Sequence, residues 1–225
     1  MARDKVQIRF RKGGDLRFVS HHDLMRCFER MLRRAELPYH ATQGFNPKPR
    51  MVFALSLALG IVGRDEVVEL ELDAELSTDE VRDRLARQAP AGMEILTVKR
   101  IDPKSTAQVR RACYRVAVPP ERRAGLAERL EALLAAPHCW VERTRPQPRR
   151  VDLRPYLRGL SVTGEALEID LWVTPNGTAR TDEVLRMLGL DDLLDAGAVV
   201  ERTTLELHNQ EQSAPGHQPS SLADR

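Results

Sequence analysis

Hydrophobic and polar residues follow regular periods along most of the chain, and the period changes repeatedly. Val6, Ile8 and Phe10 alternate with polar residues, which predicts a strand with one buried face. From Leu24 to Ala35 the apolar positions recur every three or four residues, which predicts an amphipathic helix. The rest of the first half predicts two strands, a helix and a strand, at residues 51–59, 66–73, 77–89 and 93–101.

The second half of the chain repeats this order. A strand is predicted at residues 113–119 and a helix at 120–136, where two prolines stand at the helix entry. The pattern then predicts a strand, a basic proline-interrupted link, a strand, a helix and a strand, at residues 139–144, 145–157, 166–174, 181–190 and 197–207. Each half therefore has the order βαββαβ.

This order predicts an α+β fold made of two tandem ferredoxin-like units with antiparallel sheets. A single doubly wound sheet is the alternative, but it requires strands and helices to alternate regularly, and each half has two strands in succession. We expect the first unit at residues 1–102 and the second at 111–208. The polar tail at residues 209–225 is expected to be disordered.

Composition narrows the class of protein. The 225 residues are 42% hydrophobic and 30% charged, which is typical of a soluble globular chain. No membrane helix and no signal-peptide core is apparent, so a cytoplasmic location is expected, away from membranes. Cys27, Cys113 and Cys139 are odd in number and far apart, which disfavours disulfides and metal-ligand spacings. We expect no metal site and no cofactor bound by this chain.

Charge is unevenly distributed although the net charge is only +2. Residues 1–50 hold twelve Lys/Arg against five Asp/Glu, whereas residues 159–225 hold four against twelve. Such segregation can create a basic face that suits a polyanionic partner. The alternative is that acidic and basic segments neutralise one another within the fold.

Residues 18–55 carry the densest candidate chemistry. Ser20 is a plausible N-cap, Asp23 follows it in capping-box spacing, and His21 lies in the first helical turn. Backbone N–H groups and the helix dipole favour an anion there, and Lys12 and Arg17 can reach the same end. A phosphate or carboxylate is the expected ligand. The alternative is an ordinary capped helix that binds nothing.

His21 and His22 are adjacent, so they cannot share one helical face as the two histidines of an H-E-x-x-H metal site do. His21 is a candidate general acid or base because an imidazole titrates near neutrality. The sequence identifies no nucleophile for His21 to activate.

Arginines also follow one side of this helix. They form a basic band at Arg26, Arg30, Arg33 and Arg34, and Glu29 is expected to pair with Arg33. Such a band is either a solvated helix face or a surface that contacts phosphates.

A stiff basic loop, TQGFNPKPR, follows at residues 42–50. Gly44 permits unusual backbone conformations, and two prolines restrict the residues around them. We expect the loop to present four side chains to a ligand, Phe45, Asn46, Lys48 and Arg50, although burial is the favoured role for the phenylalanine. We also expect the loop and the start of the helix to meet in one positively charged hollow.

The segment from Leu16 to Gly60, LRFVSHHDLMRCFERMLRRAELPYHATQGFNPKPRMVFALSLALG, together with the acidic strand DEVVELELD, resembles the radical-SAM-linked protein family. That family is an uncharacterised domain found alone or attached to the C-terminal end of radical SAM enzymes. The resemblance implies an accessory role beside a radical SAM enzyme, with S-adenosylmethionine and an iron–sulfur cluster in that partner only. The family's association with RNA-processing and ribosomal genes favours RNA as the ligand.

Three functions remain open. The leading hypothesis is a non-enzymatic module that holds a phosphate-bearing substrate, RNA by preference, for a partner radical SAM enzyme. The second is an endoribonuclease that uses His21. The third is a protein–protein adaptor whose acidic second half docks the radical SAM partner.

Overall fold

The computed structural model describes residues 4–208, so the tail expected to be disordered lies outside the described residues. In the first half the chain forms β1 (Asp4–Lys12), η1 (Gly14–Phe18), α1 (His21–Arg34), β2 (Met51–Phe53), β3 (Val62–Leu72), α2 (Thr78–Ala86) and β4 (Met93–Arg100). In the second half it forms β5 (Val109–Ala117), η2 (Pro120–Arg122), α3 (Leu126–Ala135), β6 (Trp140–Arg143), β7 (Arg149–Asp152), η3 (Arg154–Tyr156), β8 (Leu157–Thr163), β9 (Ala166–Trp172), α4 (Thr181–Met187), α5 (Asp192–Asp195) and β10 (Val200–Leu207).

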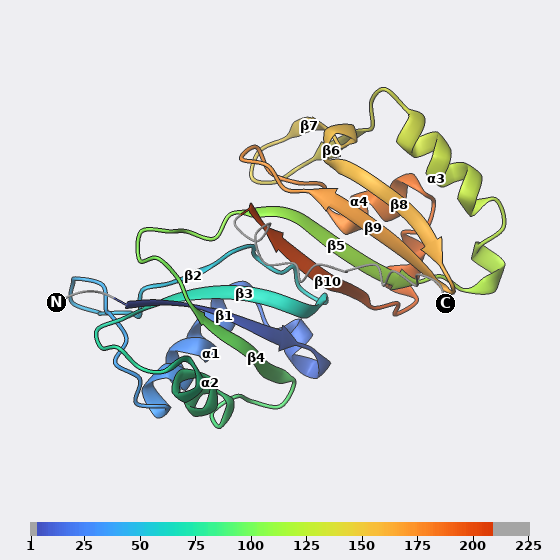
Figure 1. Ribbon diagram of the computed structural model, residues 1–225. Coiled ribbons are helices and arrows are strands. Elements are labelled where there is room, and N and C mark those ends of the chain that lie inside the picture. The colour runs from blue at the N-terminus through green and yellow to red at the C-terminus, as the bar shows by residue number, and fades with distance from the viewer. Residues whose placement is uncertain (1–3, 209–225) are drawn as a thin grey trace, which may run out of the picture.

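The described strands form one large sheet and one small one. The large sheet has the order β4-β1-β3-β10-β5-β9-β8, with β2 also paired to β3, and β6 and β7 form a separate two-stranded sheet. All pairings are antiparallel except the one between β3 and β10. Figure 1 shows α1 and α2 beside the strands of the first half, and α3 and α4 beside those of the second. The architecture is a mixed α+β fold with a mostly antiparallel sheet.

The first half confirms the local predictions. Val6, Ile8 and Phe10 are at most 1% exposed, because alternation places all three on one face of β1. That face packs against α1, which buries Leu24, Phe28, Met31 and Leu32. α2 begins after Ser77, whose hydroxyl accepts a hydrogen bond from the Glu80 backbone N–H at 3.1 Å. Both helix starts therefore follow from local capping chemistry.

Two strand predictions in residues 51–73 need correction. The strand predicted at 51–59 ends at Phe53, and residues 54–61 form a loop that packs partly against the second half. β3 begins earlier than predicted, at Val62, because Val62 and Gly63 pair with β10 and Gly63 also pairs with β1. The apolar residues at 54–61, which show little alternation with polar ones, therefore form a loop rather than a strand.

The second half differs more from the prediction. The helix predicted at 120–136 starts only at Leu126, since Gly125 has a φ of 65° and interrupts it. Part of the predicted link is β7, which pairs with β6 outside the main sheet. The second strand of the main sheet in this half is β8, which the hydrophobic pattern did not indicate.

Candidate functional site

The start of α1 is built as the sequence indicates. The Ser20 hydroxyl accepts a hydrogen bond from the Asp23 backbone N–H at 3.2 Å and donates one to the Asp23 carboxylate at 2.7 Å. The same carboxylate pairs with Arg26 at 3.0 Å. These hydrogen bonds, that from Ser20 first, lower the pKa of Asp23. A carboxylate therefore already occupies the helix start, which weakens the expected anion site.

His21 lies against the core at this helix start. Its ring meets the Phe53 ring edge-on, with centroids 5.2 Å apart, and its Nδ1 is buried without a hydrogen-bond partner. Burial, followed by the charges of His22 and Lys12, lowers the pKa of His21. The imidazole is therefore neutral at pH 7, as a general base must be.

Lys12, at the end of β1, is fully buried. Its Nζ donates a hydrogen bond to the Val19 carbonyl at 2.8 Å, and among residues 4–208 no carboxylate forms an ion pair with it. Burial lowers the pKa of Lys12 and outweighs the nearby Glu66 carboxylate. Lys12 cannot contact an external ligand in this conformation, which corrects its expected role as a phosphate contact. It holds the turn that leads into α1.

A buried ion pair next to Lys12 joins the two halves. Arg202 of β10 and Glu66 of β3 are 2% and 3% exposed, and Arg202 Nε donates to Glu66 Oε1 at 2.8 Å while Nη2 pairs with Oε2. Arg202 also donates to the carbonyls of Leu55 and Ser56, at 3.0 and 3.1 Å. Burial by itself would lower the pKa of Arg202, but the Glu66 carboxylate has the larger combined effect and raises this pKa. The hydrophobic pattern gave no sign of this pair.

Arg17 lies at a cavity between the halves. Its guanidinium stacks on the Phe18 ring, 4.3 Å from the centroid. The cavity has a volume of about 350 Å³ and is lined mainly by apolar residues from both halves, including Leu59, Ala198 and Val200. The predicted grouping of Arg17 with the helix start is therefore only approximate.

The loop at residues 42–50 and Lys12 lie at opposite ends of β3. Lys12 pairs with Gly63 at one end of β3, whereas Arg50 accepts a hydrogen bond from the Glu71 N–H at the other, about 27 Å along the strand. In Figure 1 this loop lies near the start of β1, and β1 points away from it. Lys12 therefore cannot share a hollow with the loop, whereas His21 contacts Phe53, three residues beyond the loop.

The loop itself projects from the molecule. Phe45 is fully exposed, so the prediction that it is buried is wrong. Backbone hydrogen bonds between Thr42 and Lys48, and from Arg50 to His40, close the base of the loop. Gly44 has a φ of 135°, a conformation that requires glycine, and Asn46 is exposed at the tip. The loop presents an aromatic ring beside Lys48.

The arginines of α1 are exposed, and most lack carboxylate partners. Arg26 pairs with Asp23, but no ion pair is formed by Arg30, Arg33 or Arg34 within residues 4–208, and the expected Glu29–Arg33 pair is not seen there. Arg33 and Arg34 lie in the last turn of α1, directly before the segment that leads into the loop. Residues 35–41 therefore separate this basic band from the loop along the chain.

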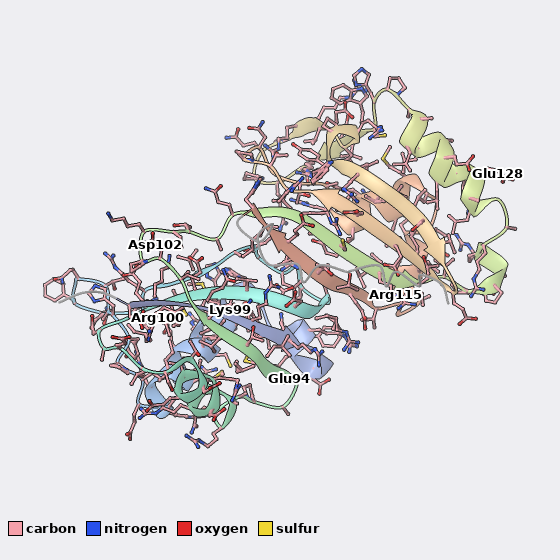
Figure 2. All side chains as sticks on the ribbon, in the orientation of Figure 1. Glu94, Lys99, Arg100, Asp102, Arg115 and Glu128 are labelled. Atoms are coloured by element: carbon pink, nitrogen blue, oxygen red, sulfur yellow. The ribbon has the colours of Figure 1, made fainter. Side chains whose placement is uncertain are left out.

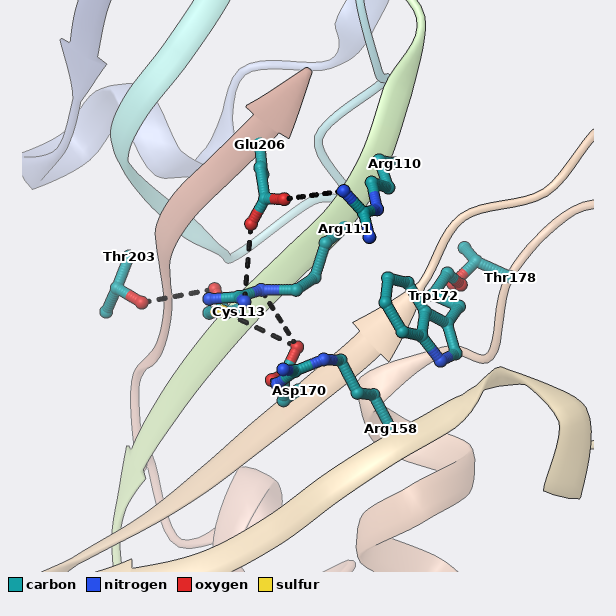
Figure 3. Close-up of polar contacts among 9 residues, drawn as sticks. All are labelled: Arg110, Arg111, Cys113, Arg158, Asp170, Trp172, Thr178, Thr203 and Glu206. Atoms are coloured by element: carbon teal, nitrogen blue, oxygen red, sulfur yellow. Dashed lines mark hydrogen bonds and ion pairs between the residues drawn. The ribbon is translucent and has the colours of Figure 1, made fainter. Parts of the chain in front are cut away.

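A second polar network covers strands β5, β9 and β10 (Figure 3). Arg111 contacts Asp170 at 3.2 Å and Glu206 at 3.3 Å, and Arg158 also pairs with Asp170. The Trp172 ring contacts the guanidinium groups of Arg110 and Arg158, at 5.5 and 5.3 Å from its centroid. Each carboxylate here is shared between arginines, so the network mainly stabilises the sheet surface. The alternation of polar and apolar residues does not reveal such cross-strand ion pairs, because they depend on how neighbouring strands are aligned.

Within the described chain, no cluster of three or more His, Cys, Asp or Glu side chains is arranged to hold a metal ion. The three cysteines are free thiols in separate places. No helix among residues 4–208 is both long and apolar enough to cross a bilayer.

These features define a mixed α+β protein with a buried ionic joint and exposed basic segments. The chain belongs to the DUF2344 family, described as an uncharacterized protein conserved in bacteria, whose family model matches residues 5–186. Nothing in that match links the chain to radical SAM enzymes. Comparison with curated proteins gives no match.

One solved structure with similarity to this chain is that of an unknown protein from Galdieria sulphuraria. The two are 14% identical, with a TM-score of 0.28, and the similarity covers 92% of this chain and 99% of the other.

Proposed function

We propose that this chain is a non-enzymatic module that binds RNA through its loop-and-helix surface, defined as the loop at residues 42–50 with Arg30, Arg33 and Arg34 of α1. The observation that carries the proposal is the fully exposed ring of Phe45 at the tip of a proline-braced loop. An aromatic ring held in water has no packing role in the molecule. It does suit a base, since bases stack on aromatic side chains.

The charges around Phe45 support the same ligand. Lys48 and the three arginines of α1 form no ion pairs among the described residues, whereas most other exposed arginines do. Unpaired cations can neutralise phosphates without first breaking a protein ion pair. The two prolines at positions 47 and 49 limit the entropy lost when the loop is ordered by a ligand.

Binding of short RNA at about 50 and 200 mM salt tests this proposal, because neutralised phosphates release counterions and make affinity fall steeply with salt. We expect Phe45→Ala to weaken binding by about 1–3 kcal/mol. The double variant Arg33→Gln and Arg34→Gln is expected to reduce the salt dependence. Arg82→Gln is the matched control, because Arg82 is an exposed helix arginine already paired with Asp79. Absence of binding at both salt concentrations overturns the proposal.

Two ferredoxin-like units are the finer description that we propose for the fold. The first half has the strand order β4-β1-β3-β2, and the second has β10-β5-β9-β8. If strands are numbered within each half, with the β6–β7 hairpin treated as an insertion, both orders become 4-1-3-2. An experimental structure in which the two halves fail to superpose contradicts this description.

The accessory role for a radical SAM enzyme rests on the sequence resemblance alone. The adaptor hypothesis shares this partner and assigns its docking to the second half. Co-purification with a radical SAM protein encoded near this chain tests both hypotheses. Loss of co-purification on charge reversal in the second half, with RNA binding retained, favours the adaptor.

A second candidate function, an endoribonuclease, is supported by one observation. His21 Nδ1 is buried without a hydrogen-bond partner, and its pKa is lowered beside Lys12, as for a group suited to accept a proton. RNA cleavage by the wild type that is lost in His21→Ala supports this function. Binding without cleavage favours the binding module.

A further inference from the structure

The hairpin formed by β6 and β7 carries a stack of three side chains on one face. The Trp140 ring is 45% exposed. His138 stacks on it, with ring centroids 5.5 Å apart and planes inclined by 29°, and the Arg150 guanidinium carbon lies 4.5 Å from its centroid. An imidazole, an indole and a guanidinium therefore form a ladder of planar groups at the surface.

Strand register produces this ladder. Trp140 pairs with Asp152 and Glu142 with Arg150, so all four side chains lie on one face of the hairpin. His138 precedes Trp140 by two residues, and its Nδ1 lies 2.7 Å from the Asp152 carboxylate. His138 is thus held by Asp152 before any ligand arrives.

The opposite face of the hairpin is fastened to the second half. Arg143 is 8% exposed and makes a bidentate ion pair with Glu183 of α4, at 2.7 and 2.8 Å. It also donates to the Thr178 carbonyl at 2.9 Å, while Val141 and Val151 pack against the core. This anchor makes the hairpin a rigid platform rather than a loose loop.

The exposed part of the hairpin is basic. Arg145 and Arg150 form no ion pair with any described carboxylate, and Arg150 contacts the Trp140 ring. Arg149 pairs with Arg143 and so belongs to the opposite face. The tip between the strands holds two further prolines, at positions 146 and 148, and no acidic residue. Unpaired guanidinium groups next to a planar stack match the two parts of a nucleotide, its phosphate and its base.

We propose that this hairpin is a second binding site, at which unpaired bases of single-stranded RNA stack on the outer faces of the His138–Trp140–Arg150 ladder. Arg145, at the tip of the hairpin, contacts the adjacent phosphate. The inference rests on the proposed RNA-binding function and adds the class of RNA. A duplex hides its base faces within its own stack, so the ladder selects single strands.

Tryptophan fluorescence tests the site directly. Trp172 is the other tryptophan of the chain, so Trp172→Phe leaves Trp140 as the single reporter. Titration of this variant with a short unstructured RNA is expected to quench the Trp140 emission, and the matching duplex is expected to quench it less. Binding of the single strand with unchanged emission overturns the inference.

Affinity supplies the second test. Trp140→Ala removes the ring that holds His138 and Arg150 in the ladder. It is therefore expected to weaken binding of the single strand by about 5- to 150-fold, the range of one lost base stack. Arg145→Gln is expected to weaken binding and to reduce its salt dependence. Arg115→Gln is the control, since Arg115 is an exposed arginine of the same half (Figure 2) that is paired with Glu168.

The outcomes separate this site from the loop-and-helix surface. No RNA binding by the wild type overturns both proposals. Wild-type binding that Phe45→Ala weakens and Trp140→Ala leaves unchanged overturns only the hairpin site. Thermal unfolding of each variant identifies those that fail to fold. If Trp140→Ala is among them, the fluorescence titration of the Trp172→Phe variant decides whether the hairpin binds RNA.

Discussion

Arg202 and Glu66 form a two-point ion pair between strands that are 136 residues apart in sequence. Neither residue is exposed by more than 3%, and two backbone carbonyls of the loop after β2 complete the arginine's hydrogen bonds. The pair lies next to the two-residue parallel contact between β3 and β10. A short backbone contact is thereby reinforced by buried charges, which tolerate no loss of a partner.

Glu66→Gln is expected to lower the free energy of unfolding by about 3–5 kcal/mol, because it leaves Arg202 buried without a counter-charge. Urea denaturation measures the change. Glu201→Gln is the control, since it removes the more exposed pair with Arg64 and is expected to cost less than about 1 kcal/mol. Equal effects of the two substitutions contradict the assigned importance of the buried pair.

Gly63→Ala is expected to destabilise the protein by about 1–3 kcal/mol. A Cβ atom at position 63 would lie 2.5 Å from the Glu66 Cγ, and the ion pair prevents that side chain from moving aside. The same substitution in a Glu66→Ala background is expected to cost less, since the obstructing atoms are gone. Additive costs in a double-mutant cycle contradict this explanation.

The stability of the protein should depend on the protonation of His21. Its folded-state pKa is lowered, so the unfolded chain binds a proton more readily and stability rises with pH through the window just below the ordinary value of about 6.5. Acidification from neutral pH is therefore expected to destabilise the wild type more than His21→Asn. Denaturation series across this window measure the difference. His22→Asn should weaken this dependence only in part, because it removes the His22 charge but leaves the burial of His21, the largest cause.

The three thiols are expected to react slowly in the folded protein. Burial is the largest cause that raises the pKa of Cys27, Cys113 and Cys139, and the thiolate is the reactive form. Labelling with an aromatic disulfide reagent should be slower than for a free thiol, and Cys139, 1% exposed, should be slowest. Labelling in urea should expose all three. A fast thiol in the native protein would contradict this assignment.

The elements set by local chemistry could be predicted from the sequence, and those set by distant partners could not. Ser20 and Ser77 cap their helices through neighbours three residues away, so both helix starts were predicted correctly. β8 was missed because its pairing to β9 defines it more than its own pattern does. The joint through Arg202 was missed for the same reason, since its partner lies in the other half.

The sequence could not decide how the segments before and after α1 meet. The 14 residues of α1 span about 21 Å, and the pairing of β2 with β3 sets how far the later segment folds back toward His21. The individual candidate residues were still informative. Phe45, Lys48 and the later arginines are exposed, whereas Lys12 is buried and His21 lies against the core.

β10 is the last strand of the described chain, so its neighbours β3 and β5 are synthesised before the strand that pairs with both of them. A ribosome that has released only the first 190 residues has produced both of those strands without the partner that lies between them. Their unpaired backbone groups can then recruit strands from other nascent chains. Truncated products that end before Val200 should therefore aggregate, even though they carry most of both hydrophobic cores.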